Sequence, residues 1–212
     1  MRVGLPIALG VAVAGVAILL SGCGGSTDAA GTLASTAAAQ TTPAFEGGLI
    51  SPRRAAPALR LRDIDGRTVD IRDLRGRPVL VTFVYAHCPD VCPLIMANLR
   101  RVRQQGGALG RSVRVIAVSV DPTGDTPVVV RRFLRAQRVG GFVDYLVGTR
   151  ARLEPVWARW AVAQNVPKSD PELVEHSALI YGITASGELA TAYPVGFDAA
   201  AIARDLPLLA RN

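Results

Sequence analysis

A pair of cysteines stands where an apolar run passes into a helical pattern, and this junction limits the folds open to the chain. Residues 79–84 are uncharged and nearly all apolar, as in a buried strand, and residues 94–105 show the periodicity of a helix. Between them lies the segment YAHCPDVCP, residues 85–93, which contains Cys88 and Cys92. The sequence therefore predicts that a strand delivers both thiols to the N-terminus of a helix.

Thiols at a helix start have a defined chemistry. If Cys88 and Cys92 both lie in the first turn, their spacing places them on one face with Cβ atoms about 5–6 Å apart. The N–H groups and the dipole of the helix start favour the thiolate, which binds soft metals and attacks disulfides. The spacing is one residue longer than Cys-x-x-Cys, and Pro93 stands where haem attachment requires histidine. Two alternatives remain, a soft-metal site and a redox-active pair.

The rest of the chain alternates between strand and helix patterns. Strands are predicted at 59–63, 67–71, 79–84, 112–120, 142–147, 178–183 and 188–193, and helices at 94–105, 128–138, 150–163 and 199–209. Because the turn at residues 184–187 is short, the last two strands must be antiparallel. We therefore expect an α/β fold of thioredoxin-like type, with a central mixed sheet flanked by helices and an N-terminal hairpin extension.

The N-terminus has the features of an export signal. Residues 3–20 carry no charge and form a segment long enough to enter a membrane. The following LSGC, residues 20–23, resembles the lipobox of bacterial lipoproteins, which implies cleavage before Cys23 and a lipid on its sulfur. The alternative is an uncleaved membrane anchor. We predict a lipoprotein signal peptide at residues 1–22 and a cell-membrane location, with the domain on the extracytoplasmic side.

A segment poor in bulky residues follows the signal. Up to about residue 57 it consists largely of Ser, Thr, Ala, Gly and Pro, so it buries too little surface to offset its ordering entropy. We predict a flexible membrane tether at residues 23–57 and one folded domain at residues 58–212.

The formal net charge of +7 is due almost wholly to arginine, because Lys168 is the only lysine. These arginines are scattered along the chain in ones and twos. That distribution argues against a nucleic-acid partner and favours a solvated surface or a mild attraction to anionic lipid.

The two histidines differ in their fitness as metal ligands. Two thiolates and one imidazole suit copper, Cu(I) in particular, whereas structural zinc requires four protein ligands. His87 adjoins Cys88 on an extended segment, so the two side chains point to opposite faces, and we expect an exposed histidine beside the site. His176 stands just before the strand at 178–183 and is the favoured third ligand. Three ligands leave a coordination position open for transfer.

Three aspartates near these motifs have plainer explanations as well as functional ones. The run Asp125-Thr126-Pro127 is typical of a helix start, with either the Asp or the Thr as the cap and the Pro near the first position. We therefore expect Asp121 and Asp125 to serve chiefly in capping and turns, with positioning or partner docking as the alternative. Asp90, between the cysteines, either raises a thiol pKa or docks a basic partner.

Three motifs together resemble the Sco/SenC family of thioredoxin-fold copper-binding proteins. They are residues 85–93, SVDP at 119–122 with DTP at 125–127, and VEHS at 174–177, and the resemblance spans residues 59–209. It implies that Cys88, Cys92 and His176 bind copper for cytochrome c oxidase assembly. It also implies that the recipient is the binuclear copper centre of oxidase subunit two. Glu175 stands where the family commonly has aspartate, which preserves the charge.

Two functions follow from these predictions. In the first, the protein is a metallochaperone, which is not an enzyme, and carries copper as Cu(I) or Cu(II). In the second, Cys88 and Cys92 form a thiol-disulfide oxidoreductase pair that reduces the cysteines of the target's copper site. Both functions require partners, a copper donor and a thiol reductant, that the sequence does not identify. A peroxidase is disfavoured because Pro89 and Asp90 do not fit the surroundings of a peroxidatic cysteine.

Overall fold

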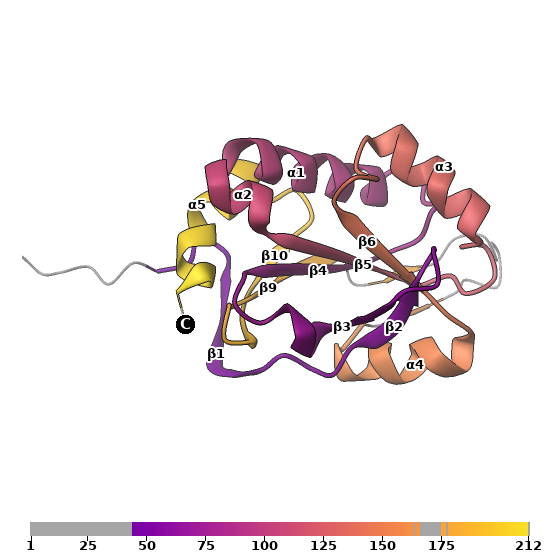
Figure 1. The fold of residues 1–212 in the computed structure, drawn as a ribbon, viewed down its shortest axis with the longest axis horizontal. Coiled ribbons are helices and arrows are strands. Elements are labelled where there is room, and N and C mark those ends of the chain that lie inside the picture. The colour runs from indigo at the N-terminus through magenta and orange to yellow at the C-terminus, as the bar shows by residue number, and fades with distance from the viewer. Residues whose placement is uncertain (1–43, 163, 166–174, 177, 212) are drawn as a thin grey trace, which may run out of the picture. The chain divides into compact units, whose positions relative to one another are not determined.

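The computed structural model describes residues 44–162, 164–165, 175–176 and 178–211 (Figure 1). For residues 164–165 and 175–176 the backbone alone is described. The predicted signal peptide and the predicted lipidation site at Cys23 lie outside these ranges. Within the described residues, no helix is long and apolar enough to cross a membrane.

A mixed sheet forms the centre of the fold. Within the described residues its strand order is β1-β10-β9-β4-β5-β6-β2-β3. The central strands β4, β5 and β6 are parallel, and β9 pairs antiparallel with β4. The bounds are β1 Gly48–Ala55, β2 Arg60–Asp63, β3 Thr68–Asp70, β4 Val79–Val84, β5 Arg114–Ser119, β6 Val143–Val147, β9 Leu179–Ile183 and β10 Glu188–Pro194.

Helices cover both faces of this sheet, with α1 and α3 on one side and α4 on the other (Figure 1). Their bounds are α1 Val91–Gln105, α2 Gly107–Ser112, α3 Pro127–Gln137, α4 Arg150–Arg159 and α5 Ala199–Ala210, with a 3-10 turn η1 at Ile71–Leu74. Two short strands, β7 Gln164–Asn165 and β8 Glu175–His176, pair with each other in a separate sheet. The predicted α/β thioredoxin-like fold is confirmed, and so are the mixed sheet and the β2–β3 hairpin.

Strand β4 lies at the centre of the core, which explains its continuous apolar sequence. All six of its residues are buried, as expected for a strand covered by helices on both faces. On one face, Phe83 contacts Trp160 and Tyr181 with ring centroids 5.8 and 6.2 Å apart. The end of β4 is thus a rigid point from which the cysteine segment departs.

The fold begins earlier in the chain than the sequence predicted. Strand β1 lies within the segment assigned to the tether, and it pairs antiparallel with β10 through Gly48 and Ala192, and again through Arg54 and Leu189. The predicted boundary between residues 57 and 58 is therefore wrong for this strand. Most β1 side chains are exposed, so the strand is held by backbone pairing and leaves no apolar pattern in the sequence.

The other boundaries differ by a few residues. Helix α1 begins at Val91, three residues before the predicted start, because Asp90 serves as its N-cap. The short helix α2 was not predicted, since its sequence contains two glycines that disfavour a helix in isolation.

Candidate dithiol and metal site

The two cysteines lie on either side of the start of α1. Cys88 belongs to the turn that follows β4, and its N–H donates to the carbonyl of Tyr85 at 3.4 Å. The Asp90 carboxylate accepts the N–H of Val91 at 2.5 Å, and Cys92 lies in the first turn of the helix. The condition that both thiols lie in the first turn therefore holds for Cys92 and not for Cys88, which precedes the N-cap.

The two thiols are nevertheless close together. The N–H of Cys92 donates to the sulfur of Cys88 at 3.2 Å, so the backbone of the helix start binds one sulfur directly. Both cysteines are free thiols, with Cys88 8% exposed and Cys92 fully buried. Cys88 is therefore the sulfur that a partner reaches first.

This arrangement gives the thiols opposite ionisation behaviour. The hydrogen bond from the Cys92 thiol, helped by backbone N–H groups and opposed by burial, lowers the pKa of Cys88 from 9.0 to about 6. The same hydrogen bond and burial raise the pKa of Cys92. At neutral pH the pair is thus a thiolate at Cys88 beside a thiol at Cys92, which is a nucleophile with a proton donor next to it.

A buried carboxylate holds the segment that carries Cys88. Asp125 accepts the N–H of Ala86 at 2.8 Å, the hydroxyl of Ser119 at 2.6 Å and the phenol of Tyr145 at 2.8 Å. Burial raises the pKa of Asp125 to about 6 against the effect of these hydrogen bonds. Sequence reasoning singled out neither Tyr145 nor the hydroxyl of Ser119 as a partner, and a serine at the end of a buried strand was the one available signal.

Helix α3 takes its cap from a different residue. The hydroxyl of Thr126 accepts the N–H of Val129 at 3.4 Å, with Pro127 at the first helical position. Of the two residues expected as this cap, Thr126 is confirmed. Capping is wrong for Asp125, for which the structure supports the positioning alternative. Asp121 has the expected turn role, since its carboxylate accepts the N–H groups of Thr123 and Gly124 at 3.1 and 2.8 Å.

His87 is exposed, in agreement with the sequence prediction. Its ring lies against the turn at Gly124, because a Cβ atom built on that glycine would lie 3.2 Å from Nδ1 of His87. The histidine thus packs beside the turn that leads into α3.

The backbone of His176 lies in β8, which precedes β9. Since β9 runs antiparallel to β4, the start of β9 lies beside the end of β4, where the hydroxyl of Thr82 donates to the carbonyl of Leu179 at 2.9 Å. The topology thus brings the start of β9, and with it the chain close to His176, to the end of β4 at which the cysteine segment begins. The side chain of His176 is outside the described part of the structure, so its role as a ligand remains a prediction.

Within the described residues, the candidate metal ligands at this site are the sulfurs of Cys88 and Cys92. Within them, no group of three or more His, Cys, Asp or Glu side chains is arranged to hold a metal ion. The pair Cys88 and Cys92 suits a soft metal that accepts few ligands.

A groove of about 560 Å³ gives access to Cys88. The start of α1 forms one wall and α3 the other, and Val128, at its rim, is 74% exposed. The residues that line it are Ala86, His87, Cys88, Pro93, Val128, Val129, Arg132, Phe133, Arg135, Ala136 and Gln137. Cys88 is only 8% exposed, and this groove is the side from which a partner can approach it.

Comparison with known proteins shows the family to which this chain is related. The family model described as SCO1/SenC matches residues 50–211. The chain belongs to the SCO1/SenC family. It is 31% identical to protein SenC of Rhodobacter capsulatus, an alignment that covers 55% of this chain and 52% of SenC. It is 25% identical to the mitochondrial protein SCO2 of Saccharomyces cerevisiae, with 65% and 47% covered. The chain thus spans about half the length of these two family members.

Solved structures of SCO1/SenC proteins have the same fold. Bradyrhizobium japonicum ScoI, solved with copper bound, is 30% identical, and the alignment covers 73% of this chain and 98% of ScoI with a TM-score of 0.64. BsSco, a Sco-family cytochrome c oxidase assembly protein with a disulfide switch, is 20% identical. For BsSco the coverage is 77% and 98% and the TM-score is 0.64, a likeness of fold. The family resemblance predicted from the cysteine, DTP and EHS motifs is confirmed.

Proposed function

We propose that this protein binds copper through Cys88, Cys92 and His176. We further propose that it delivers the ion to the binuclear copper centre of subunit two of cytochrome c oxidase. The observation that carries this proposal is the 3.2 Å hydrogen bond from the Cys92 N–H to the Cys88 sulfur, which holds two thiols together at the mouth of a groove. Membership of the SCO1/SenC family and the copper-bound ScoI structure support it.

Copper is the cargo in this proposal, and the thiol pair suits it. Cys88 is already ionised at neutral pH, so binding requires the removal of one proton, that of Cys92. In copper binding, the positive ion takes the place of the proton of the buried Cys92 thiol. With His176 as third ligand, the ion has one position open, at which a ligand of the target can attach before the sulfurs release it.

Membrane attachment completes this proposal. A lipid on Cys23 and a tether ending before β1 would hold the domain at the extracytoplasmic surface, where a donor loads the copper and a thiol reductant keeps the pair reduced. Mass spectrometry of the N-terminal peptide of the membrane-bound protein is expected to show a chain that begins at Cys23 and carries a lipid on its sulfur. A wild-type chain that keeps residues 1–22 and has no lipid on Cys23 would contradict lipidation.

The ionised Cys88 beside the protonated Cys92 also favours a second function, reduction of a disulfide in the target. The Cys88 thiolate would attack the target disulfide, which forms a mixed disulfide and releases one target thiolate. Cys92, on losing its proton, would then attack Cys88, which forms the Cys88–Cys92 disulfide and releases the second target thiol. Two electrons pass to the target, and a reductant has to restore the pair.

The variant His176→Ala separates the two functions, with His87→Ala as its matched control. We expect His176→Ala to weaken copper binding at least about tenfold, while His87→Ala binds copper as the wild type does. Both variants are expected to retain thiol-disulfide exchange, since that reaction needs no imidazole. The measurements are copper stoichiometry and affinity of the reduced protein and the rate of reduction of a model disulfide. Copper affinity unchanged in His176→Ala would refute the proposed ligand set.

A further inference from the structure

Arginines that are scattered in the sequence gather on one surface of the fold. Residues 91–120 contain five arginines and no acidic residue, and they form α1, α2 and β5. The fold adds Arg138 from the end of α3 and Arg77 from the loop before β4. The arginine surface, as we call it, consists of Arg77, Arg100, Arg101, Arg103, Arg111, Arg114 and Arg138.

Two adjoining hollows make up this surface. One has a volume of about 370 Å³ and the other of about 640 Å³, and Arg103, Arg111 and Phe142 line both. Arginines are spread over both hollows, so one small anion would contact only some of them. The shape therefore suits a ligand that presents many negative charges over an area.

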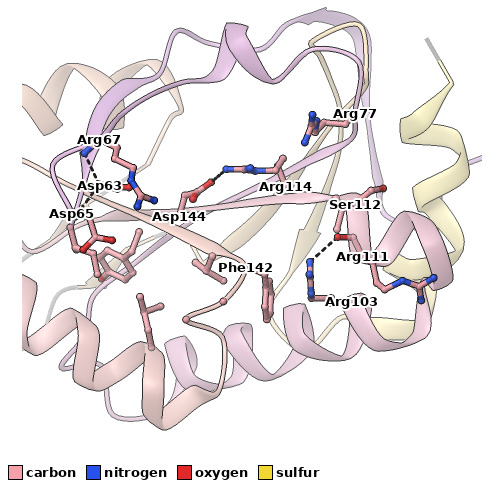
Figure 2. A pocket seen from close by; sticks show the side chains of 17 residues that line it. Asp63, Asp65, Arg67, Arg77, Arg103, Arg111, Ser112, Arg114, Phe142 and Asp144 are labelled. Atoms are coloured by element: carbon pink, nitrogen blue, oxygen red, sulfur yellow. Dashed lines mark hydrogen bonds and ion pairs between the residues drawn. The ribbon is translucent and has the colours of Figure 1, made fainter.

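The positive charge of this surface is only partly neutralised. Its acidic neighbours are engaged, because Asp63 accepts the N–H groups of two turn residues and Asp65 pairs with Arg131. Asp144 pairs with Arg114 (Figure 2). No acidic residue lines the larger hollow. Within the described residues, Arg114 is the one arginine of this surface that forms an ion pair with a carboxylate, and the other six form none.

Two of the guanidinium groups are held in place by the fold. Arg103 lies over the ring of Phe142 at 4.9 Å and donates to the carbonyl of Arg111 at 2.9 Å (Figure 2). Arg100 donates to the carbonyl of Gln137 at 3.1 Å. Ordering these side chains on binding therefore costs less entropy than ordering free arginines.

The arginine surface lies at the same end of the fold as the start of the folded chain. Helix α1 begins at the cysteines, extends about 22 Å over its 15 residues, and packs beside α2 and α5 at its other end (Figure 1). Residues just before β1 contact α5, where the N–H groups of Glu46 and Gly47 donate to the carboxylate of Asp205. The chain thus enters the fold at the end of α1 that carries the arginines, away from the dithiol.

From this arrangement we propose that the arginine surface docks on a layer of anionic lipid headgroups. The end of the domain that carries Cys88 and Cys92 then faces away from the membrane. The inference rests on the proposed membrane anchorage. A tether that enters beside the arginines keeps them close to the headgroups, and guanidinium groups bind phosphate in a bidentate manner. Each basic residue near an anionic lipid surface strengthens binding about fivefold, so several act together.

The test measures arginine exposure on vesicles. The full chain is reconstituted in vesicles of phosphatidylcholine, or of phosphatidylcholine mixed with phosphatidylglycerol. Its arginines are then modified with hydroxyphenylglyoxal and quantified by peptide mass spectrometry. We expect the arginines of this surface, chiefly the exposed Arg77, Arg101, Arg111 and Arg138, to react several-fold more slowly on the anionic vesicles and to regain reactivity at high salt. Arg152 and Arg159, on α4, are expected to react equally on both. Equal rates for the surface arginines on the two vesicle types would overturn the proposal.

A parallel arm distinguishes the lipid layer from a free anion. Inorganic phosphate is added to the protein on phosphatidylcholine vesicles, and we expect no protection. Protection equal to that on anionic vesicles would reassign the surface to a small anion and overturn the proposal.

Matched variants complete the experiment. In Arg101→Gln/Arg111→Gln/Arg138→Gln, the remaining surface arginines are expected to lose their protection. The control, Arg75→Gln/Arg152→Gln/Arg159→Gln, removes the same charge elsewhere and is expected to keep it. Both sets are exposed and form no ion pair within the described residues, so both variants should fold. The assay requires neither copper nor thiol chemistry, so its outcome is independent of the His176→Ala test.

Discussion

The N–H of Ala86 donates a 2.8 Å hydrogen bond to the buried carboxylate of Asp125, which lies 39 residues later in the chain. This bond ties the segment before Cys88 to the junction between β5 and α3. The same carboxylate also accepts the hydroxyls of Ser119 and Tyr145. The segment that carries Cys88 is therefore held in place by hydrogen bonds within the fold.

Removal of this carboxylate is expected to destabilise the fold. Asp125→Ala leaves the donors of Ala86, Ser119 and Tyr145 without their partner, which we expect to lower the free energy of unfolding by about 3 kcal/mol. Urea denaturation measures the change. The control Asp121→Ala, at a partly exposed turn, is expected to cost less than about 1 kcal/mol. Equal losses in the two variants would show that Asp125 has no special structural role.

Asp125 is also expected to make stability depend on pH. Its folded pKa of about 6 exceeds the ordinary 3.8, so the folded protein holds this proton more tightly than the unfolded chain does. The free energy of unfolding should therefore fall as pH rises from about 4 to about 6, by at most about 3 kcal/mol. The wild type is compared with Asp125→Asn by denaturation across this window. A constant difference between the two proteins would contradict the prediction.

The ionisation of Cys88 is expected to depend on its neighbour. Because the hydrogen bond from the Cys92 thiol is the main cause of the lowered pKa, Cys92→Ala should move the Cys88 titration upward from about 6 towards 9.0. The pH dependence of alkylation by iodoacetamide and the ultraviolet absorbance of the thiolate both report this midpoint. In the control Cys88→Ala, the buried Cys92 should react slowly at neutral pH. An unchanged midpoint in Cys92→Ala would assign the shift to the helix start instead.

At the DTP motif, Thr126 caps α3 and Asp125 holds the cysteine segment, and these two roles can be tested separately. Thr126→Ala removes the side chain that accepts the Val129 N–H and is expected to cost about 1 kcal/mol of stability. Since the Thr126 hydroxyl accepts from α3, whereas Asp125 accepts from the cysteine segment, the Cys88 titration should stay unchanged. A shift in that titration would show that the cap and the thiol segment are coupled.

The start of the folded region can be tested by truncation. A chain that begins at Ala58 lacks β1 and removes two N–H donors from the Asp205 carboxylate, which is 2% exposed. We expect its free energy of unfolding to fall by at least about 2 kcal/mol relative to a chain that begins at Ala44. Urea denaturation of both proteins checks this. Equal stability would restore the boundary predicted from composition.

Several elements were predictable because their signals are local. The buried strand β4 shows an unbroken apolar run, and α1 shows helical periodicity directly after it. The short turn between β9 and β10 required antiparallel pairing, which the structure has. Strand β1 was missed because its pairing with β10 uses backbone groups, which every residue has, so its exposed side chains carry no signal.

In the candidate site, too, some features have a local sequence signal and others do not. The closeness of Cys88 and Cys92 follows from their spacing, although the former lies outside the helix. The role of Asp125 was not predictable as the main one, because its three donors come from distant points in the chain: residues 86, 119 and 145. The ligand role of His176 remains a prediction from residue chemistry and family resemblance.

Residue order alone was enough to specify a strand that hands two cysteines to a helix, the class of the fold and the family, since each depends on neighbours a few positions apart. Three properties required the folded chain: which thiol is ionised, what holds its segment in place, and where the arginines gather. Each of them depends on distances between groups far apart in the chain. Burial and hydrogen bonding act on those groups only after packing has brought them together.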